Sequence, residues 1–169
     1  MTTTQQDMAL FVGLSSVLTG IDKKKLAPPL DPSNIKQVFY DCANIEDGPV
    51  LAQLLAVYAG CRAEPPAIVA ETVFKRSGPD VCYLARAIML SWYLGSWYRP
   101  IELQQHQDAE PAPPPSLAPL SARVITAATY TQGWAWNIAQ AHPMGYSNLG
   151  FGYWADQPPA LADFTGAEQ

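Results

Sequence analysis

The sequence DVCYLARAIMLSWYLG, residues 80–95, carries the strongest helical pattern in the chain. Its apolar side chains recur three and four residues apart, so they make one broad apolar face on a helix. These side chains are Val81, Leu84, Ala85, Ile88, Met89 and Trp92. Asp80 is the predicted N-cap, and Gly95 is the predicted end of the helix. We expect this helix to lie at the centre of the hydrophobic core.

Segments on both sides of this helix also have helical spacing and recognisable ends. Asp7 and Asp31 are predicted N-caps, and Pro49 opens another helix. The predicted helical ranges are 8–20, 32–42, 49–60, 68–75 and 121–142. No segment alternates apolar and polar residues convincingly, so we predict no sheet. The expected fold is all-α, a compact helical bundle of about five to six helices with an extended, irregular, aromatic C-terminal arm.

The composition fits a single domain that spans residues 1–169. With 49% hydrophobic and 15% charged residues, the chain can bury one sizeable core and is too apolar to be disordered throughout. Two segments are predicted to lie outside that core. Residues 104–119 form a loop insertion rich in Pro and Gln, and residues 143–169 form a non-helical C-terminal arm.

The net charge of -5 is unevenly distributed and argues against a nucleic-acid partner. Residues 1–99 hold nine basic and nine acidic groups, whereas residues 100–169 hold Arg123 against six acidic groups. No stripe of Lys and Arg is present to replace phosphate counterions. Residues 23–25 are three lysines after a helix end, and we interpret them as a solvated turn.

No apolar run approaches the roughly 20 residues of a transmembrane helix, so direct membrane insertion is not expected.

The usual signatures of an enzyme are missing from the sequence. Cys42, Cys61 and Cys82 lie in or beside apolar runs without paired histidines, which favours inert buried thiols over a zinc site. Glu102 and His106 would share a helix face, but an exposed pair is favoured over an acid/base couple. The sequence has no Gly-rich phosphate loop and no nucleophile elbow. We therefore predict no catalytic residue, no cofactor-binding residue and no metal ligand in this chain.

All five tryptophans lie in the second half of the chain. They are Trp92, Trp97, Trp134, Trp136 and Trp154. In one helix, Trp134 and Trp136 would project about 200° apart and could not both face one core. Two interpretations of Trp136 remain open. Either the Pro-rich loop or the arm covers it, or it belongs to a partner-binding surface.

The C-terminal arm contains aromatic rings that it cannot bury by itself. The stretch FGYWADQPP, residues 151–159, places three large rings among Gly and Pro. Such rings bury much area at low entropic cost when a pocket receives them. The receiver is either the body of this protein or a partner.

Three short motifs resemble those of a known family. They are FVGLSSVLTG at residues 11–20, SWYLG at residues 91–95 and GYWADQP at residues 152–158. The same motifs occur in the same order in the small (gamma) subunit of bacterial FAD-dependent sugar dehydrogenase complexes, the family of the sorbitol, fructose and glucose dehydrogenase small subunits. The chain length also matches, and the resemblance covers most of the domain except the loop insertion.

The resemblance implies a non-catalytic, accessory role. In those complexes a large flavoprotein of the glucose-methanol-choline (GMC) oxidoreductase type holds the FAD and oxidises a sugar or alcohol, often passing electrons to a cytochrome c subunit. The small subunit carries no cofactor and helps the flavoprotein to mature. We therefore expect this chain to bind and stabilise such a flavoprotein in a heterodimer, because a partner that binds only the folded state favours that state.

The resemblance departs from the family pattern at two places. Small subunits of this family usually begin with a twin-arginine leader, whereas the helical pattern here starts close to Met1. This predicts a cytoplasmic chain, or a periplasmic one if a leader has been removed. Residues 146–149 read YSNL where some relatives have a cysteine, so the expected attachment to the flavoprotein is noncovalent.

The predicted partner-binding residues come from the end of the central helix, from the last helix and from the arm. They are Trp92, Tyr93, Leu94, Gly95, Trp136, Tyr146, Phe151, Tyr153, Trp154, Asp156 and Pro158. The alternative hypothesis is a stand-alone small helical enzyme or ligand-binding protein. Its pocket would be lined by Trp92, Trp97 and Trp134, with His142 or a cysteine supplying the chemistry.

Overall fold

The computed structural model of the protein describes residues 5–108, 117, 119–143, 160 and 162–165. Within these ranges the fold is mainly helical, with one antiparallel sheet of two short strands. The elements in chain order are α1 (Gln5–Thr19), α2 (Lys23–Leu26), α3 (Ile35–Cys61), α4 (Pro66–Glu71), the π-helical turn η1 (Thr72–Arg76), α5 (Pro79–Leu94), β1 (Ser96–Tyr98), α6 (Pro100–Asp108), β2 (Ala122–Val124), α7 (Ala127–Thr131), α8 (Trp134–Ile138) and α9 (Ala162–Thr165).

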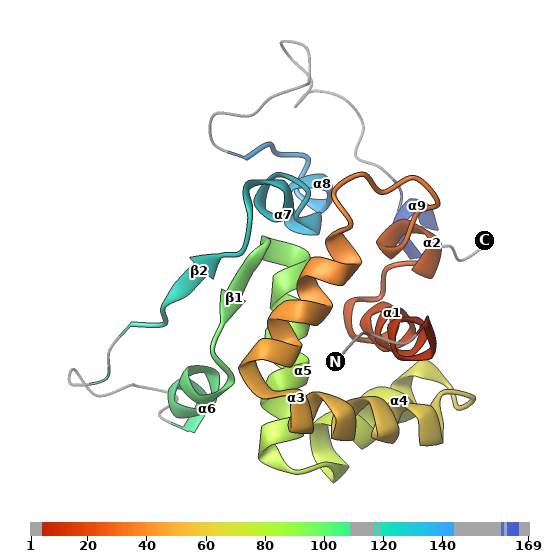
Figure 1. The fold of residues 1–169 in the computed structure, drawn as a ribbon, viewed down its shortest axis with the longest axis vertical. Helices are drawn as coiled ribbons and strands as arrows, with labels where there is room; N and C mark the ends of the chain where they lie inside the picture. The colour runs from red at the N-terminus through yellow and green to blue at the C-terminus, as the bar shows by residue number, and fades with distance from the viewer. Residues whose placement is uncertain (1–4, 109–116, 118, 144–159, 161, 166–169) are drawn as a thin grey trace.

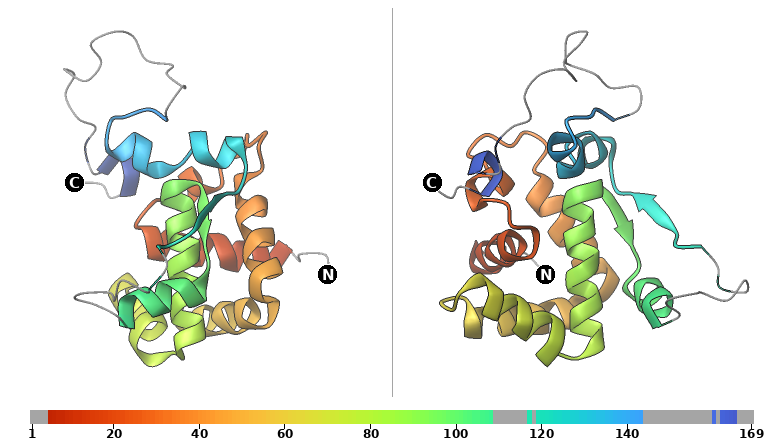
Figure 2. Two further views of the ribbon diagram at one scale, coloured as in Figure 1. Left: turned by 90° about the vertical axis from the view of Figure 1, so that its left-hand side faces the viewer. Right: turned by 180° about the vertical axis from the view of Figure 1, so that it is seen from behind.

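Helix α5 lies at the centre of the fold, as the sequence predicts (Figure 1). It packs against α1, α3, α6 and η1, and α7 and α8 contact it as well. Figure 2 shows α1 and the ribbon of β1 and β2 on opposite sides of α5. Ala85, Ala87 and Ile88 have no exposed surface, because neighbouring elements cover α5 from several directions. The apolar face read from the sequence is therefore the core of the molecule.

The observed start of α5 differs from the predicted one, whereas its observed end agrees with the prediction. The N-cap is Gly78 rather than Asp80, because Pro79 occupies the first helical position. Asp80 lies in the first turn, where a negative charge favours the positive end of the helix dipole. At the other end Gly95 has a φ of +65°, and its N–H donates to the Ser91 carbonyl at 2.8 Å. The predicted glycine end is confirmed.

Two of the predicted helices join to form α3, which is kinked at Asp47. The backbone of Asp47 is not helical, with φ −156° and ψ 84°. Its Oδ1 accepts a hydrogen bond from the Val50 N–H at 3.0 Å, so this carboxylate caps the second half of α3. The first half begins at Ile35, later than predicted, although Asp31 Oδ2 still accepts from the Ile35 N–H at 2.9 Å.

The other helices before α5 follow the predicted pattern closely. Helix α1 starts at Gln5, before the predicted cap, and ends at Thr19. The predicted stop, Gly20, follows it with a φ of +72°. The three lysines at 23–25 form one turn of helix, α2, whose N-cap Asp22 accepts from the Lys24 N–H at 2.7 Å. Their side chains are exposed, in agreement with a solvated turn. The short predicted helix at 68–75 is confirmed as α4 and η1.

The predicted helix at 121–142 is wrong. This segment contains β2, α7 and α8, because local hydrogen bonds and one glycine divide it. Thr126 caps α7 by accepting from the Thr129 N–H at 3.0 Å, while Thr129 Oγ1 accepts from the Thr126 N–H at 2.9 Å. Gly133 then separates α7 from α8. A Cβ at Gly133 would lie 2.7 Å from the Tyr93 carbonyl oxygen, so only glycine fits against the end of α5.

The prediction that the fold has no sheet is also wrong. Strands β1 and β2 pair in antiparallel register, with Ser96 opposite Val124 and Tyr98 opposite Ala122. Each strand has three residues, which is too short for an alternating pattern to stand out in the sequence. Contacts with α5 and α7 therefore determine this pairing more than local propensity does.

Two predicted irregular segments contain helices. Gln104–Asp108, expected in the loop insertion, forms the second half of α6, since Pro100 starts that helix and Gln is a good helix former. The rest of the loop insertion is described only at residues 117 and 119. Residues 162–165 of the predicted non-helical arm form α9, whereas residues 144–159 lie outside the described residues.

Candidate functional site

The end of α5, which supplies four predicted partner-binding residues, lies largely inside the described structure. Trp92 is 2% exposed and Gly95 is buried. Tyr93 and Leu94 are partly exposed. The ring of Trp92 meets Phe39 of α3 edge-on, with 4.7 Å between the ring centroids. Of the four predicted residues at the end of α5, Tyr93 and Leu94 therefore have surface that a partner could contact. Their contact with a partner remains a prediction.

Tyr93 joins the first two motifs of the sequence. Its phenol Oη donates a hydrogen bond to the Thr19 carbonyl at 2.5 Å. Burial raises the pKa of Tyr93, so the phenol remains a protonated donor at neutral pH. Thr19 closes α1, and Tyr93 lies in the last turn of α5. Residues that are far apart in the sequence therefore form one packed unit.

Trp136 has a partner within the described structure. Its indole N–H donates to the Tyr130 carbonyl at 2.8 Å, and the two rings meet edge-on at 5.5 Å. Tyr130 belongs to α7. From the sequence, the expected cover of Trp136 is the Pro-rich loop, the arm or a partner, and α7 is not among these. Trp136 remains partly exposed.

The other predicted partner-binding residues lie outside the described ranges, and they are Tyr146, Phe151, Tyr153, Trp154, Asp156 and Pro158.

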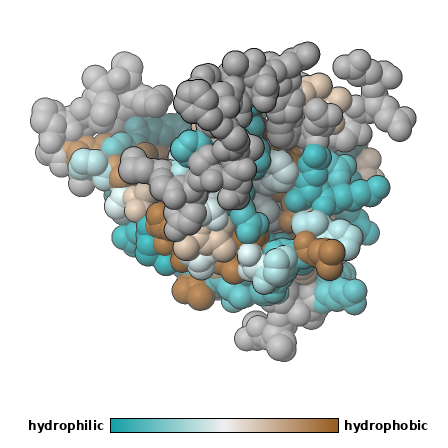
Figure 3. Space-filling model, turned by 90° about the horizontal axis from the view of Figure 1, so that it is seen from above, coloured by the Kyte–Doolittle hydropathy of each residue, from teal (hydrophilic) through white to brown (hydrophobic). Residues whose placement is uncertain are grey.

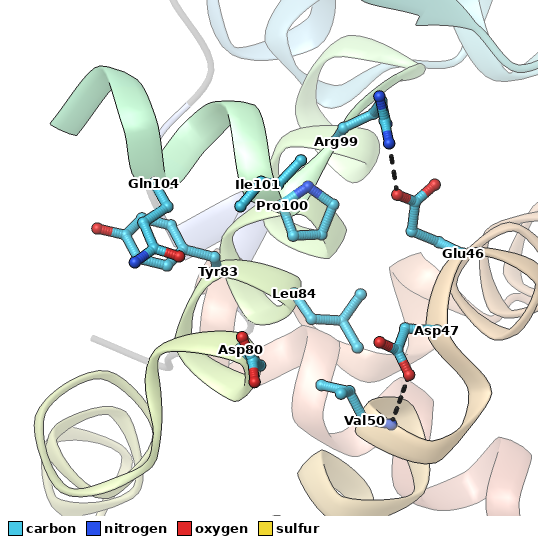
Figure 4. Close-up of a pocket in the computed structure, with 10 residues that line it drawn as sticks. All are labelled: Glu46, Asp47, Val50, Asp80, Tyr83, Leu84, Arg99, Pro100, Ile101 and Gln104. Atoms are coloured by element: carbon cyan, nitrogen blue, oxygen red, sulfur yellow. Dashed lines mark hydrogen bonds and ion pairs between the residues drawn. The ribbon is translucent and has the colours of Figure 1, made fainter. Parts of the chain in front are cut away.

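A first cavity, of about 240 Å³, opens between α3, α5 and α6 (Figure 4). Its acidic side chains already stabilise the fold. Glu46 accepts from the Trp97 indole N–H at 3.2 Å and faces Arg99 at 3.8 Å, and Asp47 caps α3. No sequence pattern predicts this cluster, because Glu46 and Trp97 come from separate elements. We assign the cluster a structural role.

A second cavity, of about 310 Å³, lies between the α2–α3 region, α5 and the α7–α8 region. Its lining includes Lys25, Leu26, Pro28, Leu30, Asp31, Pro32, Ile35, Phe39, Trp92, Thr131, Gln132, Trp134 and Asn137. Of the three tryptophans predicted to line one pocket, Trp92 and Trp134 line this cavity. Trp97 is not in its described lining and lies beside Glu46 instead. The lining residue Phe39 was missed, because its helical spacing indicates only core packing.

Trp92 is an unusual member of this lining. Its indole Nε1 is buried and has no hydrogen-bond partner among the described residues. A buried donor left without an acceptor costs about 1–3 kcal/mol. By contrast, the indole groups of Trp97 and Trp136 both have oxygen acceptors.

An open apolar groove, of about 450 Å³, lies between η1, α5 and α6. Arg86 crosses its wall, with its guanidinium 6.0 Å from the centroid of the Phe74 ring and 5.2 Å from that of Tyr83. The same guanidinium donates a hydrogen bond to Gln107. These contacts attach α6 to α5.

Cys42 and Cys61 are not activated as nucleophiles in this structure. Burial raises the pKa of Cys42, although the Arg123 guanidinium, 3.7 Å from its sulfur, acts in the opposite direction. Burial also raises the pKa of Cys61. Both thiols are therefore protonated at neutral pH. Among the described residues, no group of three or more His, Cys, Asp or Glu side chains is placed to hold a metal ion.

Glu102 attaches the strand segment to α6. Its Oε2 accepts from the Ser121 hydroxyl at 2.7 Å and from the Ser121 N–H at 3.1 Å. These hydrogen bonds, with a smaller contribution from Arg99, lower the pKa of Glu102. The carboxylate is therefore structural and is not tuned as a general acid.

We expect Glu102→Gln to remove a pH-dependent part of the stability. A lowered pKa in the folded state stabilises the fold above the ordinary carboxyl pKa of 4.5, and this stabilisation is lost as the pH falls through the folded-state value. The variant should lose up to about 1 kcal/mol of unfolding free energy at pH 7 and match the wild type near pH 2. Urea unfolding at both pH values measures this, with exposed Glu64→Gln as the control. An equal deficit at both pH values would contradict the assignment.

The exposed apolar residues are distributed over several elements. The largest exposures are those of Leu30, at 89%, and Ile45, at 84%. On the face shown in Figure 3, hydrophobic residues form small separate areas among hydrophilic ones wherever grey atoms do not cover them. Ile101 of α6 and Val124 of β2 are each 49% exposed. Such scattered residues do not by themselves define a binding patch.

Strand β2 has one open edge in the described part of the chain. The Ile125 N–H donates to the Gly95 carbonyl at 3.2 Å, so the backbone groups of Ile125 point toward β1. Along an antiparallel strand this direction alternates from one residue to the next. The backbone groups of Ala122 and Val124 therefore face away from β1. All three residues of β2 are exposed. An open edge of this kind can accept an extended segment of a partner.

Comparisons of the chain with protein-family models, with curated proteins and with solved structures find no match. None of the helices described here combines the length and the apolar character needed to cross a membrane.

Proposed function

We propose that this chain is the non-catalytic small subunit of an FAD-dependent dehydrogenase complex, in which it binds and stabilises a large GMC-type flavoprotein. The observation that carries the proposal is the presence of the three family motifs in the family order. In this proposal the FAD and the oxidation of a sugar or alcohol belong to the partner, and a cytochrome c subunit receives the electrons in complexes that contain one.

The packing of the first two motifs supports the proposal. Phe11, Leu14 and Ser15 of the first motif and Ser91 of the second have no exposed surface. The hydrogen bond from Tyr93 to the Thr19 carbonyl joins the same two segments. A resemblance in these motifs is therefore a resemblance in the core around α1 and α5, which is the part of a chain that defines its fold.

The buried position of Trp92 and Gly95 narrows the proposed partner surface. These two residues would support the surface from beneath, while Tyr93, Leu94 and the arm from about residue 146 to residue 164 would contact the flavoprotein. The open edge of β2 is a second region suited to this partner, since strand addition supplies main-chain hydrogen bonds without a deep pocket.

The test is co-expression with the flavoprotein encoded next to this gene, followed by size-exclusion chromatography with flavin absorbance recorded across the peaks. We expect both chains to elute together with bound flavin, and we expect the flavoprotein made alone to be insoluble or flavin-free. Separate elution, with an active flavoprotein made alone, would sink the proposal.

A truncation tests the contribution of the arm. A chain ending at Gly145 should bind the flavoprotein about 1,000-fold more weakly, because two aromatic anchors of about 2 kcal/mol each would be lost. The matched control ends at Thr165 and retains α9. Circular dichroism of both chains confirms that the body remains folded. An intact complex with the chain ending at Gly145 would contradict the assigned role of the arm.

The alternative hypothesis is favoured by one observation, the cavity that Trp92 and Trp134 line. Neither His142 nor a cysteine belongs to the described lining of that cavity. The observation therefore favours ligand binding over catalysis.

A further inference from the structure

We infer that the open edge of β2 binds an extended segment of the flavoprotein that carries an acidic side chain beside Arg123. This inference rests on the proposed function and adds to it the way in which the partner is recognised. Three features carry it: backbone groups that point outward, an arginine without a carboxylate partner, and the like charges that pairing with a second copy would bring together.

The outward backbone groups belong to Ala122 and Val124. Strand β1 lies between β2 and α5, so the second edge of β2 faces away from the core (Figures 1 and 2). In the part of the chain that the structure describes, the N–H and C=O groups of Ala122 and Val124 have no hydrogen-bond partner on that edge. Such groups can pair with another strand. Val124 is also 49% exposed, so an apolar side chain of the added segment can pack against it.

Arg123 lies between these two residues, and its side chain takes the opposite face of the strand. Its guanidinium lies 3.7 Å from the Cys42 sulfur, on the face where its cross-strand neighbour Trp97 donates to Glu46. Within the described ranges Arg123 forms no ion pair with a carboxylate, and the residue is exposed. A residue added directly beside Arg123 would turn its side chain to the same face. An acidic side chain at that place would therefore complement the guanidinium.

A second copy of this chain is a poorer occupant of the same edge. Two copies related by a two-fold axis would pair β2 with β2 in antiparallel orientation. The register that satisfies all the outward groups places Ala122 opposite Val124 of the other copy. It therefore places the two Arg123 residues opposite each other, and like charges in that position destabilise a strand pair. Arg123 thus favours a foreign segment over self-association.

The experiment is a competition for the flavoprotein during co-expression. The wild-type chain and a variant with a short N-terminal tag are made together with the flavoprotein, and mass spectrometry measures the ratio of the two chains bound to it. Tagged wild-type chain corrects for the tag. Val124→Pro removes one outward N–H, and proline is tolerated at a strand edge that faces solvent. We expect it to be bound at least about tenfold less than the wild type. The control Val124→Ala keeps the N–H and should be bound within about threefold of the wild type.

Two substitutions of Arg123 test the acidic side chain. Arg123→Gln removes the charge and should lower binding about two- to fivefold, whereas Arg123→Glu reverses it and should lower binding about tenfold. The matched control is Lys24→Glu, which makes the same charge change at an exposed residue of α2 and should leave the ratio near one. Circular dichroism of each isolated variant confirms that it is folded.

The outcomes separate this inference from the proposed function. If the flavoprotein binds the wild type and Val124→Pro equally, the inference fails while the proposed function stands. If it binds no wild-type chain, the proposed function fails and the inference fails with it. If the isolated wild-type chain elutes as a dimer and Val124→Pro as a monomer, a second copy occupies the edge and the inference is overturned. Equal losses for Arg123→Glu and Lys24→Glu would also overturn it, because net charge would then account for both.

Discussion

Gly95→Ala is expected to lower the free energy of unfolding by at least about 3 kcal/mol. The φ of Gly95 is +65°, a backbone conformation that costs a residue with a side chain about 1–2 kcal/mol. The larger cost comes from overlap. A Cβ would collide with the backbone of Thr129 and lie 2.5 Å from the Cα of Tyr130. Backbone atoms cannot rotate away, so α7 would have to move away from the end of α5.

The control for this prediction is Gly20→Ala. Gly20 has a nearly equal φ of +72°, but a Cβ there would meet nothing within 4 Å. This variant should therefore lose only the cost of the backbone conformation, about 1–2 kcal/mol. Urea unfolding followed by tryptophan fluorescence measures both variants. If the two variants lose equal stability, the close approach of α7 to Gly95 is not a determinant of the fold.

Phe39→Ala is expected to cost about 3–5 kcal/mol of unfolding free energy. Phe39 is 1% exposed and packs edge-on against Trp92 at 4.7 Å, where α3 meets α5. Its removal would enlarge the cavity that both rings line, and the surrounding helices cannot collapse fully into the space. The loss should therefore fall in the upper half of the range for large-to-small substitutions.

Two variants bracket the Phe39 prediction. Phe39→Leu retains most of the apolar volume and should cost less than about 1.5 kcal/mol. Leu30→Ala removes a side chain that is 89% exposed and should change stability by no more than about 0.5 kcal/mol. Chemical unfolding of the three variants gives the comparison. A loss below about 1.5 kcal/mol for Phe39→Ala would mean that the contact between α3 and α5 is not a main source of stability.

Local patterns predicted the elements that carry their own signals. The helix that ends at Gly95 has a continuous apolar face and a glycine in the left-handed conformation. Pro49 predicts the start of a new helix where α3 is kinked, and Asp47 caps the second half there. In these places the spacing of apolar residues and the turn residues act within a few positions, so the sequence alone is sufficient.

Tertiary contacts determine the parts that the sequence did not reveal. The segment at 121–142 has helical spacing, but Gly133 packs against the Tyr93 carbonyl and interrupts it. Thr129 Oγ1 donates to the Gly95 carbonyl at 2.9 Å, across a separation of 34 residues. The second cavity also depends on tertiary contacts. The sequence predicts that Trp92 and Trp134 line one pocket. The lack of an acceptor at the Trp92 indole among the described residues and the position of Trp97 beside Glu46 follow only from the packing of the helices.

The hydrogen bond between Tyr93 and Thr19 has a consequence for synthesis of the chain on the ribosome. Helix α1 emerges before α5, and the α5 segment that packs against it is made about 60–75 residues later. Until α5 is released, α1 lacks this packing and the Thr19 carbonyl lacks the Tyr93 donor. Nascent chains that stop before Trp92 should therefore be captured by chaperones or degraded, and folding should become protease-resistant only once α5 has left the ribosome.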